Sequence, residues 1–107
     1  MQFKQVKKEV KAVNFESVRA DNEDYFEAVI VKDNLKDLTA KLEDLFGKPA
    51  WPSQTKIPDY VEKVIAGFGG IMKGQTLYFL VDESFYLFAM LWPWQDGLHI
   101  TLKTGQK

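Results

Sequence analysis

The stretch from Thr76 to Trp92, with the sequence TLYFLVDESFYLFAMLW, decides the fold of this chain. Two apolar runs rich in aromatic residues, 76–81 and 85–92, flank a short polar segment at 82–84, which is the pattern of a β-hairpin. A surface helix would show a polar stripe along one side, and neither run has one. The stretch therefore predicts two antiparallel strands joined by a tight turn.

This hairpin is apolar on both of its faces. Side chains alternate across a strand, so the even-numbered residues of the second run share one face and the odd-numbered residues share the other. A solvated antiparallel sheet carries polar residues on one face, whereas these strands do not. We therefore expect both faces to be covered, with Phe79 and Leu87 in the core. The cover over the face of Tyr86 and Phe88 is expected to be the segment 3–13, a second subunit, or both.

Three other segments have the periodicity of amphipathic helices. The leucines and the phenylalanine of residues 35–46 fall on one stripe, and Gly47 is suited to end that helix. A second short helix is predicted for residues 58–66, because Pro58 is favoured in a first turn. Apolar residues at helical spacing also predict a peripheral amphipathic helix within residues 1–12.

Further strands are predicted around these helices. Residues 25–31 form an apolar run typical of a strand, and residues 68–73 a short irregular one. Gly74-Gln75 fits the two-residue turn of a hairpin. Residues 98–103 alternate apolar and polar side chains, which predicts a strand at the edge of the sheet. Residues 104–107 are expected to fray.

Together these elements predict an α+β fold in a single domain that spans residues 1–107. We expect a two-layer sandwich, in which the 35–46 and 58–66 helices pack on a mostly antiparallel sheet of about five strands. No stretch carries a motif that identifies a family, and a fold class by itself assigns no function.

The composition is that of soluble globular proteins. The apolar share is 46% and the charged share is 27%, which are ordinary values. No apolar run reaches the roughly 18 residues of a membrane span, so no membrane partner is predicted. The N-terminus lacks the apolar segment of a secretory signal. The absence of cysteine fits a reducing compartment, and a cytoplasmic location is expected.

Charge is distributed unevenly along the chain. The net charge is −1, which does not favour binding to nucleic acid, because phosphate recognition needs a positive field. Residues 1–19 carry five basic and two acidic groups, a balance of +3, and residues 20–46 carry three basic and eight acidic groups, a balance of −5. We expect these two segments to pair with each other, within one chain or between neighbours.

The residue types that carry most enzyme chemistry are scarce. His99 is the only histidine and there is no cysteine, so no metal site, cofactor or catalytic residue is predicted. On the outward side of its strand, His99 is expected to be a surface residue. The adjacent carboxylates at positions 82 and 83 are typical of a solvated turn, since glycosidase-type pairs come from separate elements.

Three loops carry the stiffest apolar side chains and the least bulky backbone. They contain Trp51-Pro52, Trp92-Pro93-Trp94 and the glycines of residues 67–70. If these loops meet, they form an apolar hollow, which is the usual form of a ligand or peptide site. The candidate binding residues are Trp51, Tyr60, Trp92, Trp94, Gln95 and Asp96.

The sequence thus predicts a small cytoplasmic interaction or accessory module without enzymatic activity. Its expected partner is another protein or a second copy of the chain, as in a homodimer. The alternative is a small-ligand-binding protein, or an enzyme, with an aromatic-lined cleft near Trp51 and Trp94.

Overall fold

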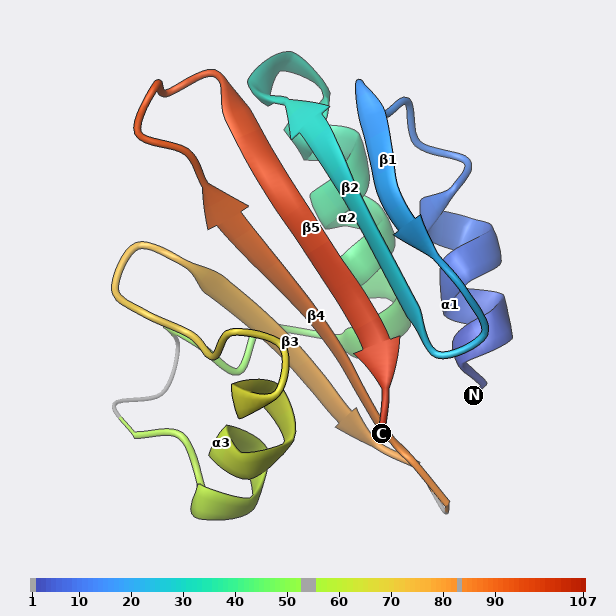
Figure 1. Ribbon diagram of the computed structural model, residues 1–107, viewed down its shortest axis with the longest axis vertical. Coiled ribbons are helices and arrows are strands. Elements are labelled where there is room, and N and C mark those ends of the chain that lie inside the picture. The colour runs from blue at the N-terminus through green and yellow to red at the C-terminus, as the bar shows by residue number, and fades with distance from the viewer. Residues whose placement is uncertain (1, 53–55, 83) are drawn as a thin grey trace.

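The structure is a computed structural model that describes residues 2–52, 56–82 and 84–107, and it contains a five-stranded antiparallel sheet of order β1-β2-β5-β4-β3 (Figure 1). Its strands are β1 Ser17–Asp21, β2 Tyr25–Val31, β3 Thr76–Val81, β4 Tyr86–Pro93 and β5 His99–Gln106. Its helices are α1 Phe3–Val10, α2 Leu35–Phe46 and α3 Asp59–Ala66, with a short 3₁₀ turn at Lys32–Asn34. The predicted α+β fold, with both of its sheet-packed helices, is confirmed.

The central hairpin forms as predicted from β3 and β4. Phe79 pairs with Phe88, and Leu80 pairs with Leu87. Asp82 and Phe85 exchange backbone hydrogen bonds, with Asp82 N to Phe85 O at 2.9 Å and the reverse bond at 3.3 Å, so the turn closes tightly. The predicted turn includes residue 83, which lies outside the described residues.

The last strand is not a sheet edge, and that prediction is wrong. β5 pairs with β2 on one side and with β4 on the other, so it is the central strand. Two of its polar side chains make hydrogen bonds to other elements: Thr104 Oγ1 donates to Phe88 O at 2.8 Å, and Thr101 Oγ1 accepts from Trp94 Nε1 at 2.8 Å. The expected fraying of residues 104–107 is also wrong, because β5 continues to Gln106.

Two helices, α1 and α2, cover one face of the sheet, called here the first face (Figure 1). Each helix turns one apolar stripe to the strands, as the helical periodicity requires. The strand residues beneath them are the alternate positions of β2, β4 and β5. The buried cluster includes Phe3, Val6, Val10, Phe26, Ile30, Leu38, Leu42, Leu87, Ala89, Ile100 and Leu102.

The opposite, second face is covered over β3 and β4 by α3, which lies in front of these strands in Figure 1. The apolar side of α3 packs on Leu77, Phe88 and Met90 through Val61, Val64 and Ile65. The expectation that segment 3–13 covers this face is therefore wrong, while cover by a second subunit stays a prediction. α1 packs on the first face, because its stripe meets Leu87 and Ala89, which point away from α3.

The two residues expected in the core have different environments. Leu87 is buried on the first face, as predicted. Phe79 is only half-buried and lies on the second face, so its placement in the core is wrong. The reason is that Phe79 belongs to the edge strand β3. It has a strand neighbour, Phe88 of β4, on one side only, so more of its ring stays exposed.

The segment between α3 and β3 is a series of turns, so the predicted strand at residues 68–73 is wrong. Gly69, Gly70 and Gly74 have positive φ angles of 107°, 72° and 87°, which are incompatible with a regular strand. A turn does form at Gly74, where Gln75 N donates to Met72 O at 3.1 Å. It does not join two strands, so it is not a hairpin turn.

The basic segment 1–19 and the acidic segment 20–46 pair within the chain, which was one of the two arrangements expected. Lys7 Nζ and Lys11 Nζ contact the carboxylate of Asp21 at 2.9 and 2.7 Å, and Lys41 Nζ lies 3.3 Å from Glu9. The hydrogen bonds from Lys11 and Lys7 lower the pKa of Asp21. In the part of the chain that the structure describes, no helix has the length and apolar character needed to cross a membrane.

Candidate functional site

The outer edge of β3 is one of the two edges of the sheet, and a neighbouring loop covers only its start. Leu77 N donates to Trp51 O at 3.1 Å, while Ala50 N and Trp51 N donate to Leu77 O at 2.7 and 3.3 Å. Trp51 thus forms an isolated antiparallel bridge with Leu77. The backbone groups of Leu77 therefore point outward, away from β4.

The next outward-facing residues of β3 are Phe79 and Val81. Backbone groups in an antiparallel strand alternate in direction with a period of two residues, so these two face the same way as Leu77. Tyr86 confirms the pattern: it lies opposite Val81 yet exchanges its backbone hydrogen bonds with Lys107, at 2.8 and 2.9 Å. Among the described residues, the outward N–H and C=O groups of Phe79 and Val81 have no backbone partner.

The covering loop stops at Trp51 for a chemical reason. Continued antiparallel pairing from the Trp51–Leu77 bridge would place Pro49 opposite Phe79. Proline has no backbone N–H and cannot donate to the strand beside it. The loop therefore cannot extend its pairing along the edge of β3, and no other backbone group among the described residues pairs with the edge beyond Leu77.

An apolar hollow of about 210 Å³ lies beside this open edge. Tyr60 of α3 forms part of its wall, with its ring centroid 6.2 Å from that of Phe79 and 6.0 Å from that of Tyr86. No charged side chain is among the described residues that line it. The lining residues are Ala50, Ile57, Pro58, Tyr60, Val61, Phe79, Leu80 and Val81. The edge thus combines unpaired backbone groups with an adjoining apolar surface, which together suit an extended peptide.

Trp51, a predicted site residue, lines a second hollow of about 430 Å³ on the other side of Ile57. Its indole Nε1 is buried and has no hydrogen-bond acceptor among the described residues. The two hollows share Ile57, so the structure brings Trp51 and Tyr60 to neighbouring sites. The second hollow is lined by Trp51, Lys56, Ile57, Glu62, Ile65, Ala66, Gly70 and Ile71.

Trp92, another predicted site residue, packs against the same α3 cluster. Lys103 Nζ lies 3.6 Å from the centroid of its ring, a cation–π contact, and also donates to Phe68 O at 3.1 Å. A side chain at Gly69 would overlap the Trp92 ring, so this glycine is required by the close approach of the two. The Trp92 indole Nε1 is buried and, among the residues described, finds no acceptor.

The remaining predicted residues belong to the turn between β4 and β5. The Trp94 ring lies against His99 with centroids 4.8 Å apart and a tilt of 33°, and the Arg19 guanidinium lies 5.5 Å from the centroid of the Trp94 ring. Asp96 Oδ1 accepts from the backbone N–H groups of Leu98 and His99 at 2.8 and 3.1 Å, and Gln95 is exposed. These contacts give Trp94 and Asp96 a structural role, because they stabilise the turn between β4 and β5. Whether any of the six predicted residues binds a ligand stays a prediction.

His99 is held by carboxylates on both sides of its ring. Nδ1 lies 2.5 Å from Asp96 Oδ2, and Nε2 lies 2.9 Å from Glu16 Oε2. The hydrogen bond to Asp96, followed by the charge of Glu16, raises the pKa of His99. Hydrogen bonds from the backbone of Leu98 and from His99 lower the pKa of Asp96. Since both ring nitrogens are engaged, this histidine is arranged as a structural link and not as a free base.

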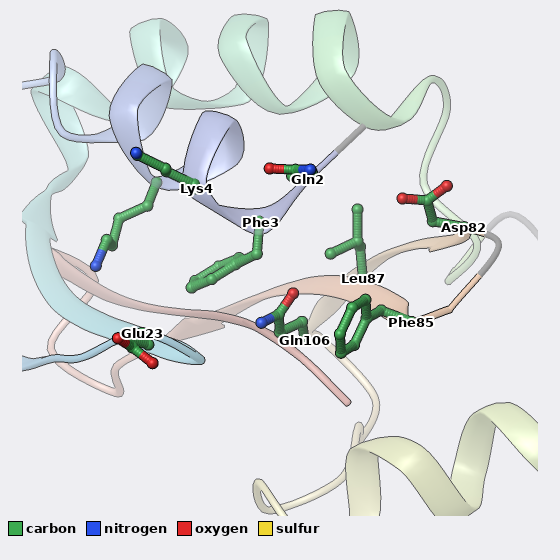
Figure 2. Close-up of a pocket in the computed structure, with 9 residues that line it drawn as sticks. Gln2, Phe3, Lys4, Glu23, Asp82, Phe85, Leu87 and Gln106 are labelled. Atoms are coloured by element: carbon green, nitrogen blue, oxygen red, sulfur yellow. The ribbon is translucent and has the colours of Figure 1, made fainter.

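Another hollow, of about 600 Å³, lies between the start of α1 and the β3–β4 hairpin (Figure 2). Figure 2 shows Phe3 and Leu87 in its interior, with Lys4 and Asp82 toward opposite sides. Both signs of charge occur around it, so its electrostatics select no class of ligand. The lining residues are Gln2, Phe3, Lys4, Lys7, Glu23, Asp82, Phe85, Leu87 and Gln106. Over the described ranges, no group of three or more histidine, aspartate or glutamate side chains is placed to hold a metal ion.

Comparison with protein-family models, with curated proteins and with solved structures found no match to this chain. The candidate site is therefore assigned on geometry alone. The sequence-based hypothesis named Trp51 and Tyr60, which the structure places at neighbouring hollows, and it did not name Phe79 and Val81. The available signal was the uncharged run 76–81 together with Pro49, and it required knowledge of which strand lies at the edge.

Proposed function

We propose that this protein is a non-enzymatic interaction module that accepts an extended segment of a partner protein along β3. The observation that carries the proposal is the pair of outward-facing residues, Phe79 and Val81, whose backbone groups lack partners among the described residues. An exposed strand edge of this kind is a ready template for β-strand addition. A cytoplasmic accessory role, as the composition predicts, is part of the same proposal.

The composition of β3 supports the proposal. Soluble proteins commonly protect an exposed edge with charged side chains, proline or a bulge. β3 carries no charged residue from Thr76 to Val81, and its register with β4 has no irregularity. An edge left in this state suits a protein that binds a strand.

The engaged state of His99 favours binding over catalysis in this proposal. Its two ring nitrogens contact Asp96 and Glu16, so neither is directed at a substrate position. A general base needs a nitrogen within reach of the proton that it removes. The arrangement instead joins the β4–β5 turn to the segment before β1.

The proposal is tested by placing a charge on each edge in turn. Val81 of β3 and Val18 of β1 are matched positions, with exposed fractions of 57% and 56%. Val81→Lys should abolish retention of partner proteins from the source cells, because a lysine on the edge opposes strand addition. Val18→Lys is the control and should leave retention unchanged. Circular dichroism checks that both variants fold.

Hydrogen exchange supplies the second measurement. The backbone amides of Phe79 and Val81 should become protected when a retained partner is added, because they would then donate to its strand. The amides of Tyr78 and Leu80 already face β4 and should change little. Equal loss of binding with both lysine variants, or unprotected Phe79 and Val81 amides in the complex, would contradict the proposal.

A second candidate function is the binding of a small apolar molecule in the hollow beside Trp51. The observation in its favour is the buried Trp51 indole N–H, which lacks an acceptor among the described residues in a hollow within the size range of ligand pockets. Trp51→Phe keeps the ring and removes the donor. Screening a metabolite library by NMR should then give shifts at the Trp51 indole in the native protein and weaker binding in the variant.

A further inference from the structure

We propose that β1 is a pH-dependent cover of the β2 edge, fastened near each of its two ends by a cluster of charged side chains that titrates. The cover is docked most firmly in the pH interval between the two titrations, and outside that interval β1 detaches from β2 more often and as a unit. This inference concerns the edge opposite to β3 and does not depend on the proposed function. Three features carry it: the exposure of β1, the two clusters, and the chemistry of His99.

Little apolar surface holds β1 on the sheet. Four of its five residues are exposed, and Ala20 is partly buried. Its register with β2 is irregular between Val18 and Ala20. A segment that buries few apolar side chains opens locally at a low cost in free energy. The side-chain contacts near its two ends therefore contribute a substantial share of what keeps β1 docked.

The first cluster lies at the last residue of β1. Lys7 Nζ and Lys11 Nζ contact the carboxylate of Asp21 at 2.9 and 2.7 Å. Glu9, the acidic residue of α1, pairs with Lys41 of α2 at 3.3 Å, so it does not take these lysines from Asp21. The hydrogen bonds from Lys11 and Lys7 lower the pKa of Asp21. The contact is therefore present above the ordinary value of 3.8 and is lost as the pH falls through the folded value.

The second cluster lies at the residue before β1. His99 Nε2 lies 2.9 Å from Glu16 Oε2, and His99 Nδ1 contacts Asp96. Ionised carboxylates only accept hydrogen bonds, so both ring nitrogens must carry a proton to bond to both of them. The cluster is therefore made by the imidazolium and not by the neutral ring. Two cationic residues also lie near it: Arg19, over the Trp94 ring, and Lys32, whose backbone N–H donates to Leu98 O.

Loss of one proton from His99 opens its contact with Glu16. Asp96 is also held by the backbone N–H groups of Leu98 and His99, at 2.8 and 3.1 Å, whereas the Glu16 side chain is half exposed. The hydrogen bond to Asp96, followed by the charge of Glu16, raises the pKa of His99. The link to Glu16 is therefore fully present below the ordinary value of 6.5 and is lost as the pH rises through the folded value.

Opening of β1 turns β2 into an edge strand. The carbonyl groups of Val29 and Tyr25 accept from Glu16 N and Asn22 N at 2.8 and 2.9 Å, and they lose these donors when β1 detaches. β2 contains one charged residue, Glu27, and every residue of β2 is buried or partly buried. The edge that it exposes therefore lacks most of the protection that β1 carries. In this way the pH sets how often the sheet exposes a second unprotected edge.

Amide hydrogen exchange of the whole protein, followed by NMR and normalised to the intrinsic rate at each pH, tests this inference. The reporters are the amides of Glu16 and Asn22, one beside each end of β1. The control is the amide of Leu77, which donates to Trp51 O at 3.1 Å on the opposite edge. Raising the pH from about 6 to about 9 should lower the protection of both reporters by about two- to fivefold, the range of an exposed ion pair, and leave Leu77 unchanged.

Two variants assign this pH dependence to the His99 cluster. His99→Gln has no titrating ring, so the protection of both reporters should no longer depend on pH over this interval. Glu16→Gln removes the other member of the link and should have the same effect at the Asn22 amide. Circular dichroism checks that each variant folds.

Asp21→Asn tests the other end at neutral pH. It should lower the protection of both reporters by about the same two- to fivefold, whereas Asp37→Asn on the exposed side of α2 should lower neither. If each change affects only the amide next to it, β1 frays at its ends and the cover that opens as a unit is overturned. Reporters that keep their protection at high pH, an equal loss at Leu77, or a pH dependence that survives His99→Gln would overturn it as well.

Discussion

The two edges of the sheet differ in every feature that governs strand addition. β1 has an irregular register between Val18 and Ala20 and contains the charged residues Arg19 and Asp21. β3 has a regular register with β4 and no charged residue. A bulge and charges protect an edge, because they disturb the straight row of backbone groups and make its desolvation costly. The difference teaches that β1 carries features that oppose strand addition and that β3, as far as it is described, lacks them.

Residues distant in sequence add to the protection of β1. Lys7 of α1 and Lys11, the residue that directly follows this helix, both contact Asp21, so a cluster of charges lies at the end of β1. Across the residues that the structure describes, the corresponding cover of β3 is the bridge from Trp51, and Pro49 prevents its extension. The comparison yields four predictions, which differ in the size of the effect.

The largest expected effect is a difference in stability loss between a substitution in the interior strand β4 and one in the edge strand β3. Phe88 is fully buried and its cross-strand partner Phe79 is half-buried. Phe88→Ala should lower the free energy of unfolding by about 3–5 kcal/mol, and Phe79→Ala by only about 1–2 kcal/mol, because less apolar area and a smaller cavity are involved. Chemical denaturation of the two variants measures both values. Equal losses would mean that β3 is buried as deeply as β4.

Hydrogen exchange should resolve the open edge residue by residue. In the free protein, the amides of Phe79 and Val81 should exchange at least about a hundredfold faster than those of Tyr78 and Leu80, which donate toward β4. The native protein observed by NMR gives all four rates in one experiment, so the neighbours serve as controls. Equal exchange rates for all four amides would contradict the conclusion that the edge of β3 is unpaired.

Loss of the charge cluster at β1 should weaken the protein under mildly acidic and neutral conditions. The pKa of Asp21 is lowered in the folded protein, so its contribution is present above the ordinary pKa of 3.8 and disappears as the pH falls through the folded value. Asp21→Asn should therefore destabilise the protein slightly at neutral pH and have no effect in strong acid. Thermal unfolding as a function of pH measures this difference, with Asp37→Asn on exposed α2 as the control. An unchanged difference across the pH range would contradict it.

The smallest effect should come from His99, which joins the β4–β5 turn to Glu16 just before β1. The pKa of His99 is raised, so its stabilisation is fully present below the ordinary value of 6.5 and is lost as the pH rises through the folded value. His99→Gln should remove this loss of stability on going to alkaline pH. Thermal unfolding of the native protein and the variant in parallel checks the sign, and a native protein that gains stability over this interval would contradict the assignment.

Local pattern was sufficient to predict the elements that depend on local chemistry. The stripe of residues 35–46 ends at Gly47, whose φ of 80° suits glycine, and helix α2 has these bounds. The hairpin of β3 and β4 was likewise evident, because two continuous aromatic runs cannot form amphipathic helices. Trp51 and Tyr60 could be named as candidates for a similar reason, since rigid aromatic side chains in loops and first turns are visible in the sequence, and their role in binding stays a prediction.

The order of the strands was not predictable from these patterns. β5 alternates polar and apolar residues as an edge strand does, yet it lies at the centre, since Trp94 and the Phe88 carbonyl satisfy the hydroxyls of Thr101 and Thr104. The partners of these hydroxyls lie on another strand or turn, so no local window contains them. The same limit applies to the helices. The apolar stripe of α1 shows that this helix packs on something, but it does not indicate which face of the sheet.

The sequence by itself determined the α+β class, the positions of the main helices and the doubly apolar hairpin, because these follow from periodicity and from the conformational limits of glycine and proline. The tertiary structure decided that α3 covers Phe88, that β5 is central and that Phe79 and Val81 remain open. Those outcomes depend on which surfaces meet among segments far apart in the chain, and the free energy of that choice is shared by many residues at once. The candidate interaction edge is a property of that choice, since a strand is an edge only after every other strand has taken its place.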